Sequence, residues 1–511
     1  MKKLITNNFL LITYLILSVF SVLPFFSGGF FTFHDDVQVA RIYEMAISIT
    51  SWQFPVRWVP DLGYGLGYPI FNFYSVLPYY IGGVLSAVGM DVLYATKLVF
   101  VIGIMLSGVS MYYLTKEFFG KLPALVSSII YLYFPYHAVN IYVRGALAEL
   151  FAYALLPLVF LSLYKIHQLR TFNKGYVVLG SLSIAAVILS HNLTSYMLLI
   201  FIIPFVMYSI ISNRERKPLP ISYGIVLLIA FSLSAFYAVP ALLESKYTNV
   251  MLVIGGGSNP IDHFVCPGQL WDSMWGYGGS APGCIDGMSF KLGKLNIILL
   301  AAAAMLLLIG WKRFKEKTGI VVFSVLGFIF SVFMTLELSS FLWSLPYMEF
   351  LQFPWRFLNF TGLFTSFLVG ILVWLVSERY SKQTAVIVTI LIILTTVIMN
   401  KGLFNPQANL PKSSADYTNN YYLNWTASKI SDEYLPKDFV RPISQKDILN
   451  SMNSFNDSGN GLYTKTPDGS GFEFGQTQVQ TASNLLSLVG VIALIAVIIV
   501  QPGSIYGKKT S

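Results

Sequence analysis

The sequence predicts an all-α polytopic membrane protein with about twelve transmembrane helices. Of its 511 residues, 55% are hydrophobic and only 11% are charged, and the mean hydropathy is +0.65. Ordinary soluble domains contain roughly 25% charged residues. This composition therefore argues against a cytoplasmic enzyme, a nucleic-acid-binding protein and a disordered chain, because none of them could cover so much apolar surface.

The spans follow from length, since a helix needs about 20 apolar residues to cross the hydrocarbon layer. Aromatic residues make up 16% of the chain, as expected where many rings line the two membrane interfaces. The predicted spans are 8–26, 97–115, 122–138, 150–166, 176–191, 194–212, 221–240, 293–311, 319–336, 357–376, 384–400 and 485–501.

The distribution of charge predicts the sidedness. More than half of the 33 Lys and Arg residues lie in the tails and in short connectors such as 116–121, 165–174, 214–217 and 312–317. Cytoplasmic connectors carry such an excess of basic residues. Both termini are therefore expected in the cytoplasm, with the protein in the cytoplasmic (inner) membrane. The net charge of +9 thus reflects membrane topology and does not indicate a nucleic-acid partner.

Residues 75–90 are apolar but short, and they include Pro78 and three glycines. If they crossed the bilayer, every later connector would change sides and the basic clusters would lie outside. We therefore expect an interfacial or re-entrant helix on the outer side.

Three regions are predicted along the chain. Residues 1–400 form the transmembrane core, with long outer loops at 27–96 and 241–292. Residues 401–484 form a small outer lobe, and residues 485–511 form the last transmembrane helix and a cytoplasmic tail. Cys266 and Cys284 both lie in the second long outer loop, where an oxidising compartment favours a disulfide; two free thiols are the alternative.

Ionisable residues are absent from the middle of every predicted span and gather at the outer ends. Because pumps and ion-coupled transporters usually need such groups within the membrane, this pattern favours a site at the outer interface.

The densest candidate lies in the first outer loop, where Asp35 and Asp36 follow the first span. Adjacent carboxylates can act as a general base or bind a divalent cation, which is the one cofactor we expect. His137 and Glu149 are candidate further metal ligands. The alternative is structural: residues 37–49 are predicted to form a helix, which one aspartate would cap.

Other polar and aromatic residues of the outer segments are candidates for binding. Arg57, Arg144 and Arg356 lie beside Pro, Gly or aromatic residues, and arginine is suited to gripping a phosphate, so we expect all three to converge on one anionic site. Singly, such residues are more often ion-paired or snorkelling. The candidates for substrate binding are His34, Arg41, Trp58, Tyr64, Tyr68 and His191. A purely interfacial loop is the alternative for the aromatic run.

These residues carry a family resemblance. His34, Asp35 and Arg41, with residues 55–58 and 63–74, resemble bacterial and archaeal membrane proteins described as 6-pyruvoyl-tetrahydropterin synthase-related. The segments at 136–149 and 353–356 fit the same family. The sequence shows no soluble pterin enzyme and no three-histidine zinc site of the kind typical of that synthase.

The broader resemblance is to C-type (GT-C) membrane glycosyltransferases, which carry an acidic motif in a long first outer loop with juxtamembrane helices. It implies a GT-C-like fold, with Asp35 as the best match to the catalytic acidic position and Asp36 as the second. The chain has Asp-Asp where several such families have Asp-Glu.

The resemblance implies inverting transfer of a sugar from a polyprenyl-phosphate donor, within the membrane lipid, to an envelope glycan, lipid or protein at the outer face. Two alternatives come from other classes. One is a transporter or flippase for envelope lipid or polysaccharide, and the other is a structural assembly partner.

Overall fold

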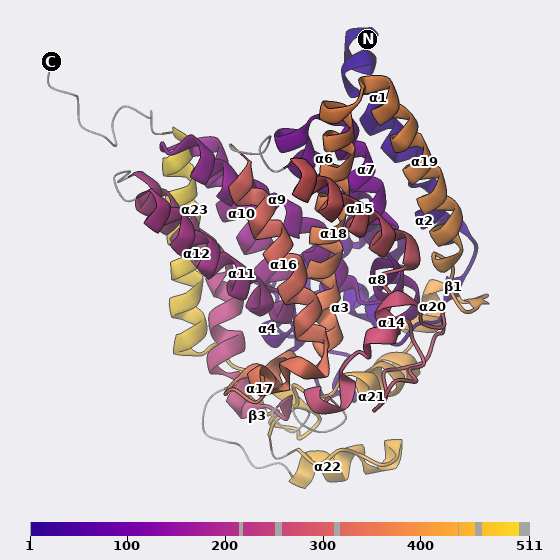
Figure 1. Ribbon diagram of the computed structural model, residues 1–511. Helices are drawn as coiled ribbons and strands as arrows, with labels where there is room; N and C mark the ends of the chain where they lie inside the picture. Colours follow the sequence, from indigo (N-terminus) through magenta and orange to yellow (C-terminus); the bar gives the residue numbers. More distant parts are fainter. Residues whose placement is uncertain are drawn as a thin grey trace, which may run out of the picture.

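Long helices dominate the computed structural model of the chain, which describes residues 2–213, 218–250, 258–310, 317–437, 439–454 and 462–499 (Figure 1). Within these residues, nine helices are long and apolar enough to cross a membrane. The bent pair Lys121–Leu132 and Pro135–Val143 would make a tenth. Lys174–Ser190 and Lys294–Ile309 are shorter apolar helices at two other predicted spans. The all-α polytopic prediction is confirmed, whereas the number twelve is not.

The predicted spans coincide with the following elements: α1 (Lys2–Leu17), α2 (Val19–Val22), η1 (Leu23–Phe26), α6 (Val92–Phe119), α7 (Lys121–Leu132), α8 (Pro135–Ala138), η2 (Val139–Val143), α9 (Leu147–Leu169), α10 (Lys174–Ser190), α11 (Asn192–Ser212), α12 (Pro218–Leu243), α15 (Lys294–Gly310), α16 (Thr318–Thr335), α18 (Leu358–Arg379), α19 (Lys382–Asn400) and α23 (Gln478–Ile499). Short helices make up most of the connecting structure: α3 (Gln38–Thr50), α4 (Ile70–Phe73), α5 (Leu77–Ala87), η3 (Ser245–Tyr247), η4 (Pro260–His263), α14 (Pro267–Trp271), η6 (Glu337–Ser339), α17 (Ser340–Trp343), η7 (Met348–Leu351), η8 (Pro354–Phe357), η9 (Lys401–Leu403), α20 (Ser414–Thr418), η10 (Tyr422–Ala427), α21 (Ser428–Ile430), η11 (Gln445–Asp447) and α22 (Ile448–Ser454).

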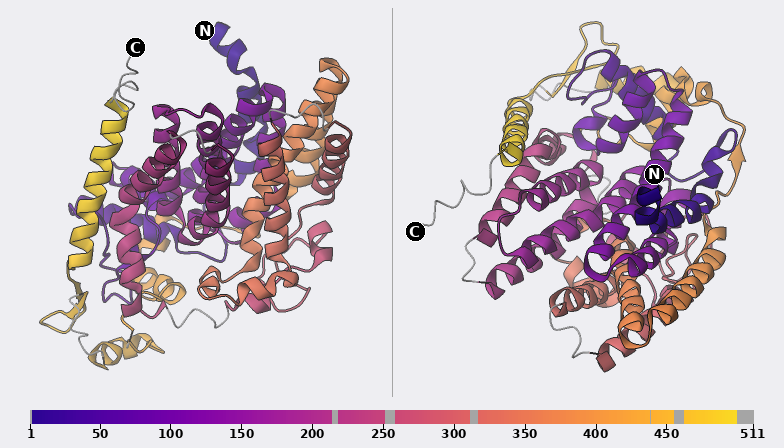
Figure 2. Two further views of the ribbon diagram at one scale, coloured as in Figure 1. Left: turned by 60° about the vertical axis from the view of Figure 1, so that its left-hand side comes forward. Right: turned by 90° about the horizontal axis from the view of Figure 1, so that it is seen from above.

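The beginning of α1 and the end of α23 lie at the same end of the bundle (Figures 1 and 2). Contacts of basic residues place other helix ends there. Lys174 at the start of α10 donates to the carbonyl of Ile498 at 3.2 Å, and Lys165 pairs with Glu117 at 2.7 Å. Part of the charge pattern lies outside the described residues, namely Arg214, Arg216, Lys217, Lys312, Arg313, Lys315, Lys508 and Lys509.

The connecting elements gather at the opposite end, which we call the outer end after the topology predicted from the sequence (Figure 1). Helix α5 has 11 residues, so it is about 16 Å long and too short to cross the bilayer. It packs closely on α3 because Gly82 and Gly83 have no side chain. A Cβ atom on Gly83 would lie 2.4 Å from Cγ of Met45.

One short antiparallel pair of strands and further contacts fasten the outer lobe to the first outer loop. Strand β1 (Phe30–Phe31) pairs with β2 (Asn409–Leu410), with Phe30 opposite Leu410. Within the lobe, β3 (Tyr463–Lys465) pairs with β4 (Phe472–Phe474). The first outer loop and the lobe are thus close neighbours although almost 400 residues separate β1 from β2.

Of the nine single-helix spans among the described residues, α9 and α18 are the most enclosed, because 94% and 89% of their apolar windows are buried inside the protein. Helix α23, with 11% buried, lies at the edge of the bundle (Figure 2). The outer ends of α9 and α18 are therefore surrounded by protein, and the candidate site lies there.

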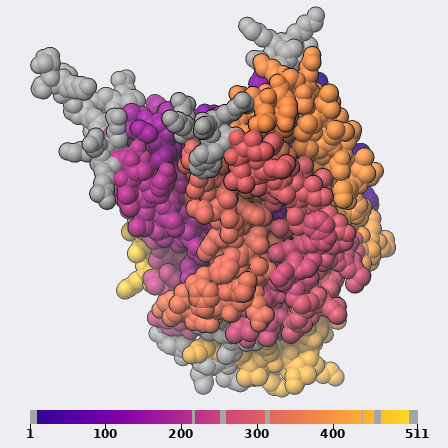
Figure 3. Space-filling view, viewed as in Figure 1, coloured from indigo at the N-terminus to yellow at the C-terminus, as the bar shows by residue number. Residues whose placement is uncertain are grey.

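A disulfide between Cys266 and Cys284, with a Cα–Cα distance of 5.6 Å, closes the loop after α12. Val265, Leu270 and Phe290 of this loop share a buried apolar cluster with Tyr136 and Trp355. The loop therefore packs directly beside the outer ends of the central helices. Its rose-coloured surface is continuous with that of the neighbouring helices (Figure 3).

Candidate functional site

The first outer loop runs against the segment between η2 and α9. The amide of His34 donates to the carbonyl of Val143 at 3.1 Å, and the amide of Asp35 donates to the carbonyl of Arg144 at 3.0 Å. Gln38 adds a side-chain bond to the carbonyl of Gly145 at 2.9 Å. These three hydrogen bonds hold the backbone of Asp35 next to that of Arg144.

The backbone of this segment needs a wide turn and a glycine. Residues Val139–Val143 form a π-helical turn, in which the amide of Arg144 donates to the carbonyl of Val139 at 2.9 Å. Gly145 has φ +62°, and a Cβ atom there would lie 2.3 Å from the ring of Phe33. Glycine thus permits both the left-handed turn and the close approach of the first outer loop.

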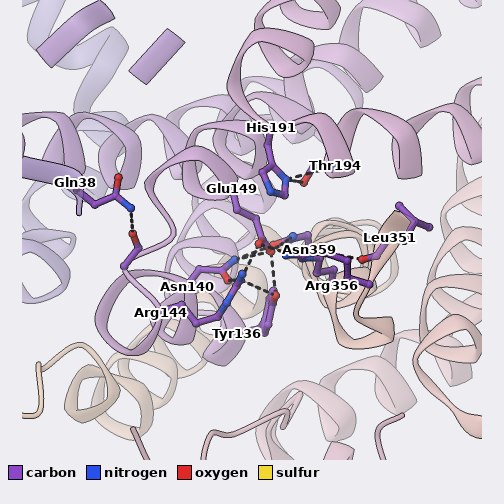
Figure 4. A network of polar contacts seen from close by, with 12 residues as sticks. Gln38, Tyr136, Asn140, Arg144, Glu149, His191, Thr194, Leu351, Arg356 and Asn359 are labelled. Carbon is purple, nitrogen blue, oxygen red and sulfur yellow. Dashed lines mark hydrogen bonds and ion pairs between the residues drawn. The ribbon is translucent and has the colours of Figure 1, made fainter. Parts of the chain in front are cut away.

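Glu149, in the first turn of α9, is the centre of a buried polar network (Figure 4). Its Oε2 accepts from Nη1 of Arg144 at 2.7 Å. Its Oε1 accepts from the hydroxyl of Tyr136 at 2.9 Å and from Nδ2 of Asn359 at 2.7 Å. Asn140 lies 3.4 Å from the same oxygen. Because both oxygens already accept hydrogen bonds, Glu149 is suited to holding the network together and not to taking a proton from a substrate.

Arg356 approaches the same carboxylate from η8, just before α18. Its Nε lies 3.9 Å from Oε2 of Glu149, and its Nη1 donates to the carbonyl of Leu351 and to Gln352, both at 2.9 Å. The buried Nε makes no hydrogen bond within the described residues. Arg356 is therefore fixed in place with donor capacity left unused.

Two guanidinium groups thus share one ion-pair partner, Glu149, and this imbalance sets the electrostatics of the site. Burial opposes the positive charge of Arg144, but Glu149, Tyr136 and Asp35 outweigh it and raise the pKa of Arg144 above its ordinary value. Asp35 also interacts electrostatically with Arg356. Arg144 and Arg356 make the region around Glu149 suited to an anion.

His191, at the turn between α10 and α11, lies next to Glu149 (Figure 4). Its Nδ1 accepts from the amide of Thr194 at 3.2 Å, so the proton of the neutral ring is on Nε2. Burial lowers the pKa of His191 to about 3, against the opposing effect of Glu149. The imidazole is therefore neutral at physiological pH and offers an N–H donor.

The structure distinguishes the two adjacent aspartates. The N-cap of α3 is Val37, with no side-chain capping bond, so the predicted capping role is not what the aspartates do. Asp36 pairs with Lys412 of the outer lobe at 3.5 Å, and its carbonyl accepts from Tyr422. Burial raises the pKa of Asp36, opposed by Lys412. Asp35 is partly exposed, and no hydrogen bond or ion pair engages its carboxylate anywhere in the described residues.

Tyr74, which interacts electrostatically with Asp35, belongs to a second group of residues that the sequence reveals only in part. Arg41 is only 4% exposed; its guanidinium lies 4.2 Å from the ring centre of Tyr74, and its Nη2 donates to Ser431 at 2.9 Å. Ser431 in turn donates to Glu433 at 3.3 Å. Both Asp35 and Glu433 interact electrostatically with Tyr74. Only Arg41 of this group is predicted, because Glu433 reaches it through folding of a distant lobe.

Of the three arginines expected at one site, Arg144 and Arg356 meet at Glu149, and Arg57 does not. Arg57 donates to Asn72 at 2.7 Å, to the carbonyl of Phe236 at 2.7 Å and to Asn484 at 2.8 Å. Asn72 also donates to Glu244 at 2.8 Å. Arg57 is thus excluded from the Glu149 network because another buried network, joined to α23, already uses its donors.

The four expected metal ligands do not form one site. Asp36 is paired with Lys412, and Glu149 is occupied by donors. His137 is fully buried, stacks on Tyr153 with ring centres 4.6 Å apart, and its Nδ1 contacts the carbonyl of Leu132. Across the described ranges no three His, Cys, Asp or Glu residues group in a way that could hold a metal ion. The residues present do not fit a resident divalent cation.

The remaining candidates are placed as follows. Nε2 of exposed His34 contacts the carbonyl of Tyr277 at 3.0 Å, so the disulfide loop reaches the edge of the site. Trp58 stacks on Phe474 with ring centres 5.5 Å apart. The hydroxyl of Tyr64 donates to Asp432 at 3.0 Å.

Tyr68 is fully buried, and its hydroxyl accepts from the amide of Tyr434 at 3.1 Å. Trp58, Tyr64 and Tyr68 therefore join the first outer loop to the lobe, and this packing leaves little of Tyr64 and none of Tyr68 for a substrate.

Comparison with protein-family models identifies part of the chain. Residues 71–255 match the 6-pyruvoyl-tetrahydropterin synthase related domain, described as a membrane protein. The predicted family resemblance is thereby confirmed over these residues, which include Arg144, Glu149 and His191. Comparison with curated proteins finds no significant match.

Among solved structures, the fold is similar to the crystal structure of the Archaeoglobus fulgidus oligosaccharyltransferase in its apo form. The TM-score is 0.46 and the sequence identity 11%, over 85% of this chain. The chain spans 60% of the length of that structure.

Proposed function

We propose that this protein is a membrane glycosyltransferase that moves a sugar from a polyprenyl-phosphate donor to an envelope glycan, lipid or protein acceptor. One observation carries the proposal. The partly exposed carboxylate of Asp35 makes no hydrogen bond or ion pair among the described residues, the amide of Asp35 donates to the carbonyl of Arg144 at 3.0 Å, and Asp35 interacts electrostatically with Arg144 and Arg356, which share Glu149 as their ion-pair partner. A general base next to an anion-binding group is the chemistry that displacement of a sugar from a phosphate requires.

The reaction would proceed as a single displacement. Asp35 takes the proton of an acceptor hydroxyl while the hydroxyl oxygen attacks the anomeric carbon on the face opposite the phosphate. A new glycosidic C–O bond forms, the C–O bond to the phosphate breaks, and the lipid phosphate leaves with the electron pair. Arg144 and Arg356 stabilise the negative charge of the leaving group. Glu149 keeps both arginines in position, and no step is assigned to a metal.

The structure favours Asp35 over Asp36 as the base. Lys412 stabilises the ionised form of Asp36, and Tyr422 holds its backbone carbonyl. Asp36 therefore joins the outer lobe to the first outer loop. The carboxylate of Asp35 makes no such contact within the described residues and is available to a substrate.

The position of the site supports the proposed sidedness. The Glu149 network lies at the first turn of α9, whereas Lys165 lies near the other end of that helix and Lys174 contacts the end of α23. By the positive-inside tendency, those lysines belong in the cytoplasm. We accordingly place both termini in the cytoplasm and the active site on the outer face of the inner membrane, where a polyprenyl-phosphate head group would lie at the right depth.

Transfer by the purified full-length chain tests the proposal. The protein in detergent is incubated with radiolabelled polyprenyl-phosphate hexoses and pentoses and a membrane lipid extract as acceptor. We expect label to move covalently to the acceptor, with release of polyprenyl phosphate. Movement of labelled lipid across vesicles that contain the protein, without a covalent product, would instead favour the transporter or flippase class.

A further inference from the structure

Glu433 brings a second carboxylate from the outer lobe to the edge of the site. It is partly exposed, as is Tyr74. The hydroxyl of Ser431 links it to the first outer loop: this hydroxyl accepts from Nη2 of Arg41 at 2.9 Å and donates to Oε1 of Glu433 at 3.3 Å. An arginine cannot accept a hydrogen bond, so the direction of this chain is fixed. Arg41 and Ser431 thus orient the carboxylate of Glu433.

Arg41 has more donor capacity than the protein uses. It is 4% exposed, its long contact to the hydroxyl of Tyr79 measures 3.4 Å, and its buried Nε makes no hydrogen bond in the described part of the chain. Buried donors are rarely left unsatisfied, because an unpaired donor costs free energy. The missing acceptor therefore points to a polar group brought by a ligand.

Tyr74 connects this group to the proposed base. Arg41 lies against one face of its ring, with 4.2 Å between the guanidinium carbon and the ring centre. Asp35 and Glu433 both interact electrostatically with Tyr74. Burial raises the pKa of Glu433, opposed by Arg41. Two carboxylates, a cation and a partly exposed aromatic ring therefore share one neighbourhood.

We propose that Glu433, Tyr74 and Arg41 form a subsite that binds the hydroxyl-bearing ring of a sugar beside Asp35. A carboxylate accepts hydrogen bonds from hydroxyl groups, a guanidinium donates to hydroxyl oxygens, and an aromatic ring offers an apolar face. The inference rests on the proposed glycosyl transfer and adds a role for the outer lobe, which supplies Glu433. The sugar belongs either to the donor or to the acceptor, and the two arms of the experiment below distinguish them.

The experiment uses full-length protein in detergent and Glu433→Gln. This variant keeps the shape of the side chain and its acceptor for Ser431 but removes the charge. In the donor arm, equilibrium binding of radiolabelled polyprenyl-phosphate hexose is measured in an Asp35→Asn background, where no turnover interferes. In the acceptor arm, KM for the lipid acceptor is measured with Asp35 intact. Glu473→Gln, on exposed β4, is the matched control.

Loss of the carboxylate should weaken one constant about tenfold to hundredfold, as for loss of a hydrogen bond to a charged group. A higher donor Kd assigns the subsite to the donor sugar, and a higher acceptor KM assigns it to the acceptor. Unchanged donor Kd and acceptor KM in a folded Glu433→Gln protein would overturn the subsite, as would a wild-type chain that binds no donor. Binding without transfer would refute the proposed reaction, and equilibrium binding of the labelled acceptor lipid would then replace its KM beside the donor Kd in deciding the subsite.

Glu433→Asp keeps the proposal testable if Glu433→Gln does not fold. The shorter carboxylate preserves the charge opposite Arg41, so the melting temperature should stay near that of the wild type. The hydroxyl-binding oxygen is withdrawn, and the affected constant should still change by severalfold. Wild-type constants in this variant would contradict the subsite.

Discussion

Replacing Glu149 by Gln tests whether one carboxylate holds the two site arginines. The oxygen of the new amide can still accept hydrogen bonds from Tyr136 and Asn359, as Oε1 of Glu149 does at 2.9 and 2.7 Å. The amide nitrogen then faces Nη1 of Arg144, which lies 2.7 Å from the oxygen it replaces. Two donors would oppose each other, and Arg144 and Arg356 would lose the carboxylate they share.

The magnitude follows from burial. Glu149 is 1% exposed, and both arginine side chains are about 10% exposed. Removing one partner of a buried ion pair costs about 3–5 kcal/mol. For a chain of this size, that loss corresponds to a melting temperature lower by roughly 3–5 °C. Thermal unfolding in detergent, followed by intrinsic fluorescence, measures it.

Two matched variants make this prediction specific. Glu349→Gln changes an exposed glutamate of η7 and should alter stability by less than about 0.5 kcal/mol. Combining Glu149→Gln with Arg144→Gln removes one of the two uncompensated charges, so the double variant should recover part of the lost stability. A Glu149→Gln protein that melts within 1 °C of the wild type would refute the account of the network, with ~1 °C taken as measurement error.

Three further outcomes are expected. Asp36→Asn removes a partly exposed pair with Lys412, so transfer should fall by no more than severalfold and stability by about 0–1 kcal/mol; a transfer loss above a hundredfold would contradict this. The pKa of His191 is about 3 in the folded protein and about 6.5 in the unfolded chain. The unfolded state therefore binds more protons between pH 6.5 and pH 3, and the stability of the protein should fall as the pH falls through this range. The fall should be smaller in His191→Gln. Cys266→Ser should destabilise the loop closed with Cys284 by about 3 kcal/mol, seen as faster limited proteolysis; unchanged cleavage would contradict this.

The spans could be predicted from sequence because hydropathy and helix length are local properties. The count differs where α10 and α15 are short and where α7 and α8 form a bent pair. The short helix at 75–90 was also predictable, since its length alone prevents a crossing.

The site was predictable only in part. Arg144, Glu149 and Arg356 come together because the outer ends of neighbouring helices lie at one depth. Their roles were not predictable. Glu149 is the counter-ion of the two arginines, and its Oε1 already accepts hydrogen bonds from Tyr136 and Asn359, so it does not serve as the predicted metal ligand.

Long-range contacts account for the remaining differences. Arg57 bonds to Asn484, which is 427 residues away, and so belongs to another network. Glu433 reaches Arg41 through Ser431, 390 residues from Arg41. No local pattern reports such contacts, because the fold alone decides which side of the outer lobe meets the first outer loop.

Transfer of sugar by Asp35→Asn, compared with the wild type and Asp36→Asn, tests the central claim most directly. Asparagine is nearly isosteric with aspartate but cannot accept the proton, and general-base catalysis typically contributes about 10²–10⁴-fold. We predict that transfer by the Asp35→Asn protein falls by at least about 10²-fold. This variant should still melt at the wild-type temperature and still bind polyprenyl-phosphate sugar. The Asp36→Asn protein should stay active. Near-wild-type turnover in a folded Asp35→Asn protein would contradict the account, because transfer would then not depend on the catalytic base that the account assigns to Asp35.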